Sequence, residues 1–225
     1  MQLSANAIVA DIGGTNARFA LVTPNWFLLD IKVLSCADYP GFADAFQAYR
    51  ETLGGETIQA AAIAMPNPVD GDHIQMTNHH WSFSIQQTRQ ELGLDKFLVL
   101  NDFVALALSI PFLTDADKQQ TGGELPVEDA AIALLGPGPG LGVGGLMQID
   151  ERWHPIPSEG GHATFSPTNK REFALNQVLQ QRFGHVSFER TASGPGLQNL
   201  YQAICEVDDA KANMTLSPGD ITSQA

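Results

Sequence analysis

Short hydrophobic runs separated by polar turns mark the beginning of the chain. Three apolar runs follow one another with only a few polar residues between them, at 7–12, 17–22 and 26–34. Short runs rich in β-branched and aromatic residues, stopped by glycine, proline or asparagine, are typical of strands joined by tight turns. The pattern therefore predicts an antiparallel three-stranded meander.

A helical period appears next. Phe42, Ala45, Phe46 and Tyr49 are spaced as on one face of a helix, which predicts a helix that ends before the glycines at 54 and 55. Helices and continuous apolar runs then alternate, as in an α/β domain with a mixed sheet. Further elements are predicted as strands at 58–65 and 97–100 and as helices at 42–53, from a capping box at 84–87 to about 93, and at 103–113.

A polar stretch at 114–128 interrupts this pattern before a second half begins. We predict two domains, at 1–110 and 111–225, with the boundary near 110–113. In the second half, strands are predicted at 130–135 and 142–149 and helices at 169–183 and 196–207. Residues 218–222 look like the start of another helix, so we expect this sequence to be part of a longer chain.

Charge and composition narrow the classes of function. The chain has 25 acidic and 12 Lys and Arg residues, a net charge of −13, which argues against binding to nucleic-acid phosphates or to anionic membrane surfaces. No apolar run approaches the roughly 20 residues of a membrane span, and the first residues do not resemble a signal peptide. The two cysteines, Cys36 and Cys205, are too few for a disulfide framework. We predict a soluble, cytoplasmic protein.

Two glycine-rich segments are candidate phosphate sites. After the first strand, the carboxylate of Asp11 is followed by Gly13, Gly14, Thr15 and Asn16. Such a turn can hold a phosphate on its backbone N–H groups while the carboxylate holds a hydrated divalent cation. An ordinary hairpin turn is the alternative, because turns favour these residues in any case.

The second glycine-rich segment spans 136–142 and also lies at the end of a predicted strand. Its glycines alternate with other residues: they are Gly136, Gly138, Gly140 and Gly142. Close approach of a ligand to the backbone would explain them, since glycines weaken the flanking strands. A rigid Pro-Gly linker is the alternative.

Polar residues on three further segments are candidates for a catalytic or ligand-binding site. Asn101 and Asp102 directly follow an apolar strand, and ligands of α/β sheets bind at such strand ends. Asp102 could take a proton from a hydroxyl there. The alternative is that both residues cap the helix that follows, which is equally consistent with the sequence. Glu159 and His162 flank two glycines, and Glu189 follows in a second polar loop. These acceptors suit a polyhydroxylated ligand, although His162 could also be a purely structural histidine.

Six ordered blocks of the sequence resemble the bacterial glucokinases of the hexokinase-like group, in the actin-like ATPase superfamily. The blocks are ADIGGTNARFAL (10–21), MTNHHWSFS (76–84), LNDFVALALSIP (100–111), EGGH (159–162), GHVSFERTASGPGL (184–197) and NLYQAI (199–204). The resemblance covers nearly the whole chain. It implies mixed sheets of the ribonuclease H-like kind in two α/β domains around a cleft.

The resemblance also implies an activity and a set of roles. The activity is ATP-dependent phosphorylation of glucose at the 6-hydroxyl, the first step of glycolysis, with Mg²⁺ and in a homodimer. Asp102 matches the catalytic base, and Asp11 is our candidate metal ligand. Residues that match sugar-binding positions, or lie in a block near them, are Asn78, Asn101, Asp102, Glu159, His162 and Glu189. Asp11, Gly13, Gly14, Thr15 and Asn16 match the first phosphate loop, and Gly136, Gly138, Gly140 and Gly142 the second.

Two departures from the family pattern leave a second hypothesis open. Pro139 stands where relatives have threonine, which removes a hydroxyl and a backbone N–H that could donate to phosphate. Relatives are also longer and carry an adenosine-binding segment in their last third. The alternative to a kinase is therefore a non-catalytic sugar-binding or regulatory chain derived from one.

Overall fold

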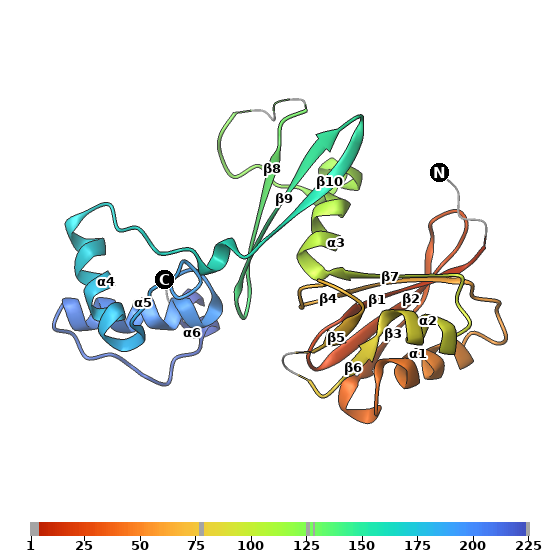
Figure 1. Ribbon diagram of the computed structural model, residues 1–225. Coiled ribbons are helices and arrows are strands. Elements are labelled where there is room, and N and C mark those ends of the chain that lie inside the picture. The colour runs from red at the N-terminus through yellow and green to blue at the C-terminus, as the bar shows by residue number, and fades with distance from the viewer. Residues whose placement is uncertain (1–4, 77–78, 125–126, 128, 224–225) are drawn as a thin grey trace. The chain divides into compact units, whose positions relative to one another are not determined.

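A computed structural model describes residues 5–76, 79–124, 127 and 129–223 (Figure 1). The chain divides into two compact units, Met1–Leu106 and Ala107–Ala225. The boundary predicted near 110–113 falls in a short 3-10 helix, η2 (Ile110–Phe112), just beyond this division. That the units are the two kinase domains, the second incomplete, stays a prediction.

The first unit is built on a five-stranded sheet with the strand order β3-β2-β1-β4-β7. The antiparallel meander is confirmed, because β2 pairs antiparallel with both β1 and β3. Strand β4 pairs parallel with β1 and with β7, so that the sheet is mixed, as predicted. The strands are β1 (Ala7–Ile12), β2 (Asn16–Val22), β3 (Leu28–Ser35), β4 (Ala60–Met65) and β7 (Lys96–Asn101).

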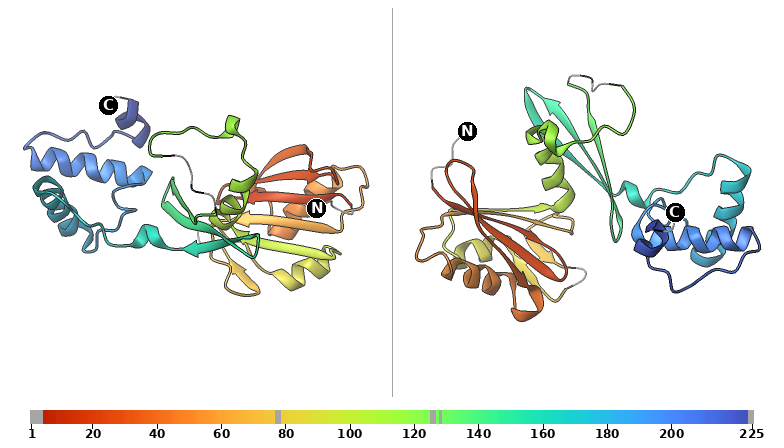
Figure 2. Two further views of the ribbon diagram at one scale, coloured as in Figure 1. Left: turned by 90° about the horizontal axis from the view of Figure 1, so that it is seen from above. Right: turned by 180° about the vertical axis from the view of Figure 1, so that it is seen from behind.

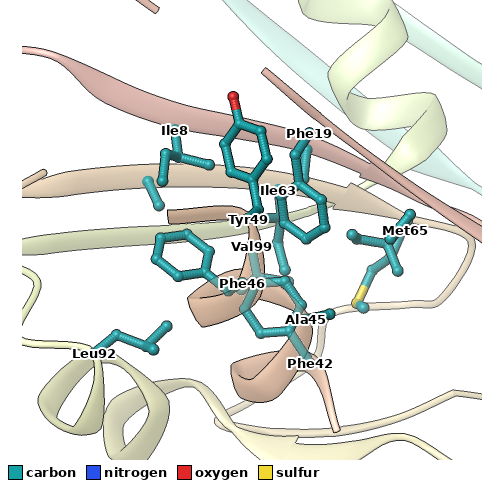
Figure 3. Close-up of a cluster of buried hydrophobic side chains, with 14 of the residues drawn as sticks. Ile8, Phe19, Phe42, Ala45, Phe46, Tyr49, Ile63, Met65, Leu92 and Val99 are labelled. Atoms are coloured by element: carbon teal, nitrogen blue, oxygen red, sulfur yellow. The ribbon is translucent and has the colours of Figure 1, made fainter. Parts of the chain in front are cut away.

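Helices α1 (Phe42–Glu51) and α2 (Ile85–Glu91) lie on the same face of this sheet (Figures 1 and 2). Successive side chains of a strand point to opposite faces of the sheet, so every second residue of each strand faces α1 and α2. Figure 3 shows Phe42, Phe46 and Tyr49 of α1 among Phe19 and Ile63 of the sheet. These side chains are all at most 1% exposed, so the periodicity seen in the sequence marks the core correctly.

Tyr49 is completely buried, and its hydroxyl donates a hydrogen bond of 3.0 Å to the carbonyl oxygen of Asp30. Burial, with the negative charge of Asp30 adding to it, raises the pKa of Tyr49 to about 12. Tyr49→Phe should lower the free energy of unfolding by about 0.5–1.5 kcal/mol, measured by urea denaturation.

The same hydroxyl gives a pH dependence with a definite sign. Between its ordinary pKa near 10 and its folded value near 12, Tyr49 is ionised only in the unfolded chain. Stability should therefore fall as the pH rises through this window, and the fall should be smaller in Tyr49→Phe. Equal alkaline losses in both proteins would contradict this.

Two short strands, β5 (His73–Gln75) and β6 (Ser82–Ser84), form a separate hairpin that the sequence pattern did not predict. The second one leads into α2, where the predicted cap is present: Ser84 Oγ accepts from the backbone N–H of Gln87 at 3.1 Å. Asp72 supports the same helix start, because its carboxylate accepts from the Gln86 N–H at 2.8 Å. The side chain of Ile74 in β5 is only 2% exposed and packs in the hydrophobic core, which attaches the hairpin to the sheet.

The edge strand β3 carries exposed apolar side chains, among them Ile31 and Val33. Asp30 interrupts this edge with a positive φ of 50°, where the register between β2 and β3 shifts. Bulges and charged residues of this kind hinder pairing of an open edge with another strand. Asp30 and Lys32 thus protect the edge from pairing.

The described part of the second unit contains a three-stranded antiparallel sheet with the order β10-β9-β8 and the α-helices α4, α5 and α6. Leu175, Leu179, Val186 and Ala203 form its buried cluster, to which α4 and α5 contribute. The elements are β8 (Ile132–Pro137), β9 (Leu141–Ile149), β10 (Arg152–Ser158), α4 (Lys170–Phe183), α5 (Gly194–Val207) and α6 (Pro218–Ser223).

Strand β10 was not predicted, because Pro155 and Pro157 interrupt its apolar pattern. Its position at the edge of the sheet explains why they are tolerated, since an edge strand needs only half of its backbone N–H groups. The helix predicted at 103–113 is also shorter than expected: α3 covers Asp102–Ser109 and η2 follows it. Among the described helices, none is long and apolar enough to cross a membrane.

Candidate active site

Polar side chains of the first unit gather where its parallel strands end. Strands β1, β4 and β7 run in parallel, so their carboxyl ends share one edge of the sheet, and α3 continues directly from β7 (Figure 1). Asp11 lies near the end of β1, and Asn101 and Asp102 follow one another from β7 into α3. This is the edge at which ligands of α/β sheets bind.

Asp102 is partly buried at this edge. Burial raises the pKa of its carboxyl group above the ordinary value, a hydrogen bond from the Phe103 N–H opposes this, and the charge of Asp11 raises the pKa further. The Phe103 N–H lies 2.8 Å from Asp102 Oδ1. A carboxylate that is harder to ionise than usual is a better proton acceptor.

Asn101 acts as the cap of α3, which was the alternative interpretation of this residue. Its Oδ1 accepts from the backbone N–H of Phe103 at 3.0 Å and of Val104 at 3.2 Å, and its Nδ2 donates to the Asn67 carbonyl at 3.3 Å. The two interpretations were open for both residues. Both accept from N–H groups of the first turn of α3, Asn101 from two and Asp102 from one, so the acid–base role of Asp102 stays a prediction. A role of Asn101 in sugar binding stays a prediction.

Asn67 belongs to this edge but was not singled out from the sequence. It is 5% exposed, and its Nδ2 donates to the Gln75 carbonyl at 3.1 Å. It therefore joins the β5–β6 hairpin to Asn101. A signal was present, because an asparagine between two prolines directly follows the buried strand β4.

The first glycine-rich segment is the hairpin turn between β1 and β2. The Gly13 N–H donates to the Asn16 carbonyl at 2.9 Å, and the buried Cys36 packs beneath the turn, with its N–H 2.9 Å from the Thr15 carbonyl oxygen. Neither Gly13 nor Gly14 has a positive φ. The backbone of this turn thus does not need glycine for its conformation.

Arg18 is a cation near this turn that sequence reasoning missed. Its guanidinium lies 3.0 Å from the carboxylate of Asp11, and both side chains are more than half exposed. The signal was the strand pairing, in which Asp11 and Arg18 are direct cross-strand partners. An exposed ion pair of this kind contributes little stability, so Arg18 is free to exchange partners with an anion.

The second glycine-rich segment is the tip of the β8–β9 hairpin rather than a long loop. The strands extend to Pro137 and from Leu141, and the Gly138 N–H closes the tip by donating to the Gly140 carbonyl at 2.8 Å. A Cβ atom added to Gly138 would meet nothing within 4 Å. Neighbouring atoms do not crowd Gly138, and its φ is not positive, so the fold itself does not require glycine there. A ligand that approaches the backbone closely would be one reason for a glycine at this position.

The predicted sugar residues of the second unit come together around this hairpin. Glu159 directly precedes a 3-10 turn, η4 (Gly160–His162), and His162 ends it, so that Glu159 Oε2 and His162 Nε2 are 3.8 Å apart. Both side chains are well exposed. The turn packs closely against β9, because a Cβ atom on Gly161 would lie 2.1 Å from the Leu141 carbonyl oxygen.

Glu189 contacts both the turn and the hairpin. Its backbone N–H donates to the Gly161 carbonyl at 2.9 Å, and its Oε2 accepts from the Leu141 N–H at 2.9 Å. Ser193, the cap of α5, donates to the Glu189 carbonyl at 2.8 Å. Glu159, His162, Glu189 and the second glycine-rich segment are thus brought together within this unit.

Comparison with known proteins identifies the family. A sequence profile described as Glucokinase matches residues 8–225, nearly the whole chain. The chain belongs to the glucokinase family.

Two curated relatives of the glucokinase family illustrate the match. The Bifunctional protein glk of Paraburkholderia xenovorans (strain LB400) is 48% identical over 97% of this chain and 34% of its own length. The Glucokinase of Neisseria meningitidis serogroup C / serotype 2a is 46% identical over 97% of this chain and 66% of its own length. The chain thus spans about one third of the bifunctional relatives and about two thirds of the other.

Solved structures of glucokinases confirm the fold. A glucokinase from an Antarctic psychrotroph has a TM-score of 0.88 at 30% identity, over 98% of this chain and 70% of that one. A ROK family glucokinase from Streptomyces griseus, in complex with glucose and AMPPNP, has a TM-score of 0.55 at 18% identity, over 91% and 62%. The predicted actin-like ATPase fold is confirmed, with a mixed sheet in the first unit, whereas the described sheet of the second unit is antiparallel.

The geometry leaves the individual roles of the site residues as predictions. Asp11, the first turn, Asn101 and Asp102 belong to the first unit, and Glu159, His162, Glu189 and the second hairpin to the second. Asn78 lies outside the described residues. Within the described part of the chain, no three His, Cys, Asp or Glu side chains are grouped to hold a metal ion.

Proposed function

We propose that this chain carries the residues for ATP-dependent phosphorylation of glucose at the 6-hydroxyl, the first step of glycolysis. The observation that carries the proposal is the partly buried Asp102 at the end of β7, with its raised pKa, on the same sheet edge as Asp11 and the first glycine turn. Membership of the glucokinase family supports the same reaction.

Asp102 would act as the general base. Its carboxylate would accept the proton of the sugar hydroxyl as that oxygen attacks the terminal phosphorus of ATP, and the bond from this phosphorus to the bridging oxygen would break, with ADP as the leaving group. In phosphoryl transfer most of the catalysis comes from positioning and from neutralising charge, so a base held at a helix start is well suited to orient the hydroxyl. The N–H of Phe103 fixes one carboxylate oxygen, which leaves the other for the substrate.

The two glycine-rich turns would bind the phosphates of ATP. Gly13, Gly14, Thr15 and Asn16 supply one turn, and Gly136, Gly138, Gly140 and Gly142 belong to the other. The proposal is supported by the open space at Gly138 and by Arg18, the cation beside the first turn. Streptomyces griseus glucokinase, which has the same fold, was solved with the ATP analogue AMPPNP.

A magnesium ion would be held at the first turn. Mg²⁺ sites in such enzymes use one or two carboxylates and complete the shell with phosphate oxygens and water, so Asp11 with the nearby charge of Asp102 fits this donor set. The ion would supply charge neutralisation at the transferring phosphate. Asp11 would have to share its carboxylate between the ion and Arg18.

The sugar would be held by hydrogen-bonding side chains. Glu159, His162 and Glu189 are grouped in the second unit, and Asn101 and Asp102 at the strand edge of the first; Asn78 completes the proposed set. Carboxylates and an imidazole can pair with several hydroxyl groups at once. Such a site rejects analogues that lack a hydroxyl, because its own polar groups are then left unpaired.

A second candidate function is sugar binding without phosphoryl transfer. Pro139 favours it, because this residue at the tip of the second hairpin has no backbone N–H to offer a phosphate. The proposed sugar-binding residues do not include Pro139, so sugar binding would not be affected by it.

One pair of measurements decides between the two functions. Glucose and Mg-ATP are titrated separately by calorimetry, and glucose 6-phosphate formation is followed on mixing them. We expect both ligands to bind and the product to form. Glucose binding without Mg-ATP binding or product would favour the second candidate. Replacing Pro139 with threonine should then restore nucleotide binding, and absence of glucose binding would contradict both functions.

We further propose that the two units are the two kinase domains, and that the protein is a cytoplasmic homodimer. The described cysteines, Cys36 and Cys205, are both free and buried, as expected in a reducing compartment. Analytical ultracentrifugation tests the dimer.

A further inference from the structure

Glu189 has a contact that its proposed role in sugar binding does not explain. Its Oε2 lies 2.9 Å from the backbone nitrogen of Leu141, the first residue of β9 after the hairpin tip. The two residues are 48 positions apart, so this is a tertiary contact. A carboxylate that accepts from a backbone N–H makes a charge-assisted hydrogen bond, one of the stronger kinds.

The backbone of Glu189 is itself fixed on both sides. Its N–H donates to the Gly161 carbonyl at 2.9 Å, on the turn that carries Glu159 and His162. Its carbonyl accepts from Ser193 Oγ at 2.8 Å, and the same Oγ accepts from the Gly196 N–H at 3.0 Å in the first turn of α5. The side chain therefore extends from a rigid support toward the hairpin.

Gly140 gives independent evidence that this contact shaped the sequence. A Cβ atom on Gly140 would lie 2.6 Å from Glu189 Oε2, too close for a carbon and an oxygen that are not bonded, so the carboxylate would have to move away. Gly140 has no positive φ, so its backbone conformation does not require glycine. At Gly140 the group that approaches the backbone is thus a side chain of the chain itself, whereas at Gly138 the space is open.

A carboxylate has two oxygens and can accept from two donors at once. Oε2 is engaged by the hairpin, and Oε1 can accept from a sugar hydroxyl. A sugar bound to Oε1 would then reduce the mobility of the Glu189 carboxylate. Because Oε2 is hydrogen-bonded to Leu141, the mobility of the hairpin tip would also decrease.

We propose that Glu189 is a positioning residue that joins the sugar site to the second phosphate hairpin, so that sugar binding orders the tip at 138–141. This inference rests on the proposed sugar site and deepens it. It assigns to Gly140 the function of leaving room for the Glu189 carboxylate. Energetic coupling between two sites requires an element whose conformation is affected by binding at either site, and the hydrogen bond from Leu141 to Glu189 provides such a connection.

The test uses the full chain and four variants. Glu189→Ala removes both contacts, while Glu189→Gln keeps an oxygen that can accept from Leu141 but loses the charge. Gly140→Ala leaves Glu189 in place and displaces its carboxylate. Gly122→Ala is the matched control for an added methyl group in the same unit, because a Cβ atom there would meet nothing within 4 Å.

Two readouts are measured for each protein: glucose affinity by calorimetry, and amide hydrogen exchange of the 138–141 segment with and without glucose. In the unchanged chain glucose should slow this exchange. Glu189→Ala and Gly140→Ala should each weaken glucose binding by about tenfold or more and abolish the glucose-dependent protection. Glu189→Gln should retain slow exchange at Leu141, and Gly122→Ala should resemble the unchanged chain in both readouts.

The double variant makes the test decisive. If Gly140→Ala acts through the carboxylate, it should have no further effect in the Glu189→Ala background, because the two changes remove one interaction. Additive effects, or glucose protection that survives in Gly140→Ala, would overturn the proposal. A chain that binds no glucose would contradict the proposed function and with it the coupling, and the exchange rate of Leu141 without sugar would still decide whether Glu189 holds the hairpin.

Discussion

Replacing Asp102 with asparagine should lower kcat for glucose phosphorylation by about 10²–10⁴-fold, the usual contribution of a general base, with little change in glucose affinity. Asparagine keeps the shape of the side chain and its place at the start of α3, but it cannot accept the hydroxyl proton. The measurement is a coupled assay of glucose 6-phosphate at saturating glucose and Mg-ATP. A variant with near-full kcat would rule out Asp102 as the base.

The pH profile of the unchanged chain tests the same residue. Only the ionised carboxylate can take a proton, so activity should fall as the pH decreases through the pKa of Asp102. Because burial raises that pKa, the decrease should begin at a higher pH than for an ordinary aspartate. In Asp102→Asn the residual activity should lack this acid limb.

Stability should change in the opposite direction to activity. A carboxyl group with a raised pKa is harder to ionise in the folded chain than in the unfolded one, so its charge destabilises the fold at neutral pH. Asp102→Asn should therefore raise Tm at pH 7. The gain should disappear at a pH below the ordinary aspartate value, where Asp102 is protonated in both states. Asp95→Asn, at an exposed position of the same unit, is the control, and it should change neither Tm at pH 7 nor kcat.

The elements that could be predicted from sequence are those whose pattern is local. Strands β1, β4 and β7 are apolar runs bounded by turn residues, and α1 shows its buried face through Phe42 and Phe46. The β5–β6 hairpin and β10 could not be predicted, because three-residue strands carry no period and prolines conceal an edge strand. Their pairing is decided by partners distant in sequence.

The candidate site shows the same division. The sequence points to Asp102 and Glu159 because polar residues at strand ends and between glycines are visible locally. The capping role of Asn101 was one of two open interpretations, and only its hydrogen bonds to α3 decide for it. The contact between Glu189 and Leu141 could not be predicted, since it depends on how two loops pack.

Replacing Gly161 should have a large effect, because the turn with Glu159 and His162 packs directly on the β8–β9 hairpin. Gly161 has no positive φ, so the backbone alone would accept alanine. The added Cβ atom would, however, lie 2.1 Å from the carbonyl oxygen of Leu141, and 3.1 Å from its carbonyl carbon. Backbone atoms on both sides cannot rotate away as a flexible side chain would, so the turn and β9 must separate.

Gly161→Ala should therefore lower the free energy of unfolding by about 1–3 kcal/mol, as overpacking of a close contact does. The change should also weaken glucose binding, because the Gly161 carbonyl accepts from the Glu189 N–H and moves with the turn. Urea denaturation and calorimetry measure the two effects. Gly122→Ala is the matched control in the same unit, since a Cβ atom there would meet nothing within 4 Å. If Gly161→Ala matched that control in both measurements, the turn and the hairpin would not be in the contact described, and the hydrogen bond from the Glu189 N–H to Gly161 would not be what holds the Glu189 carboxylate beside Leu141.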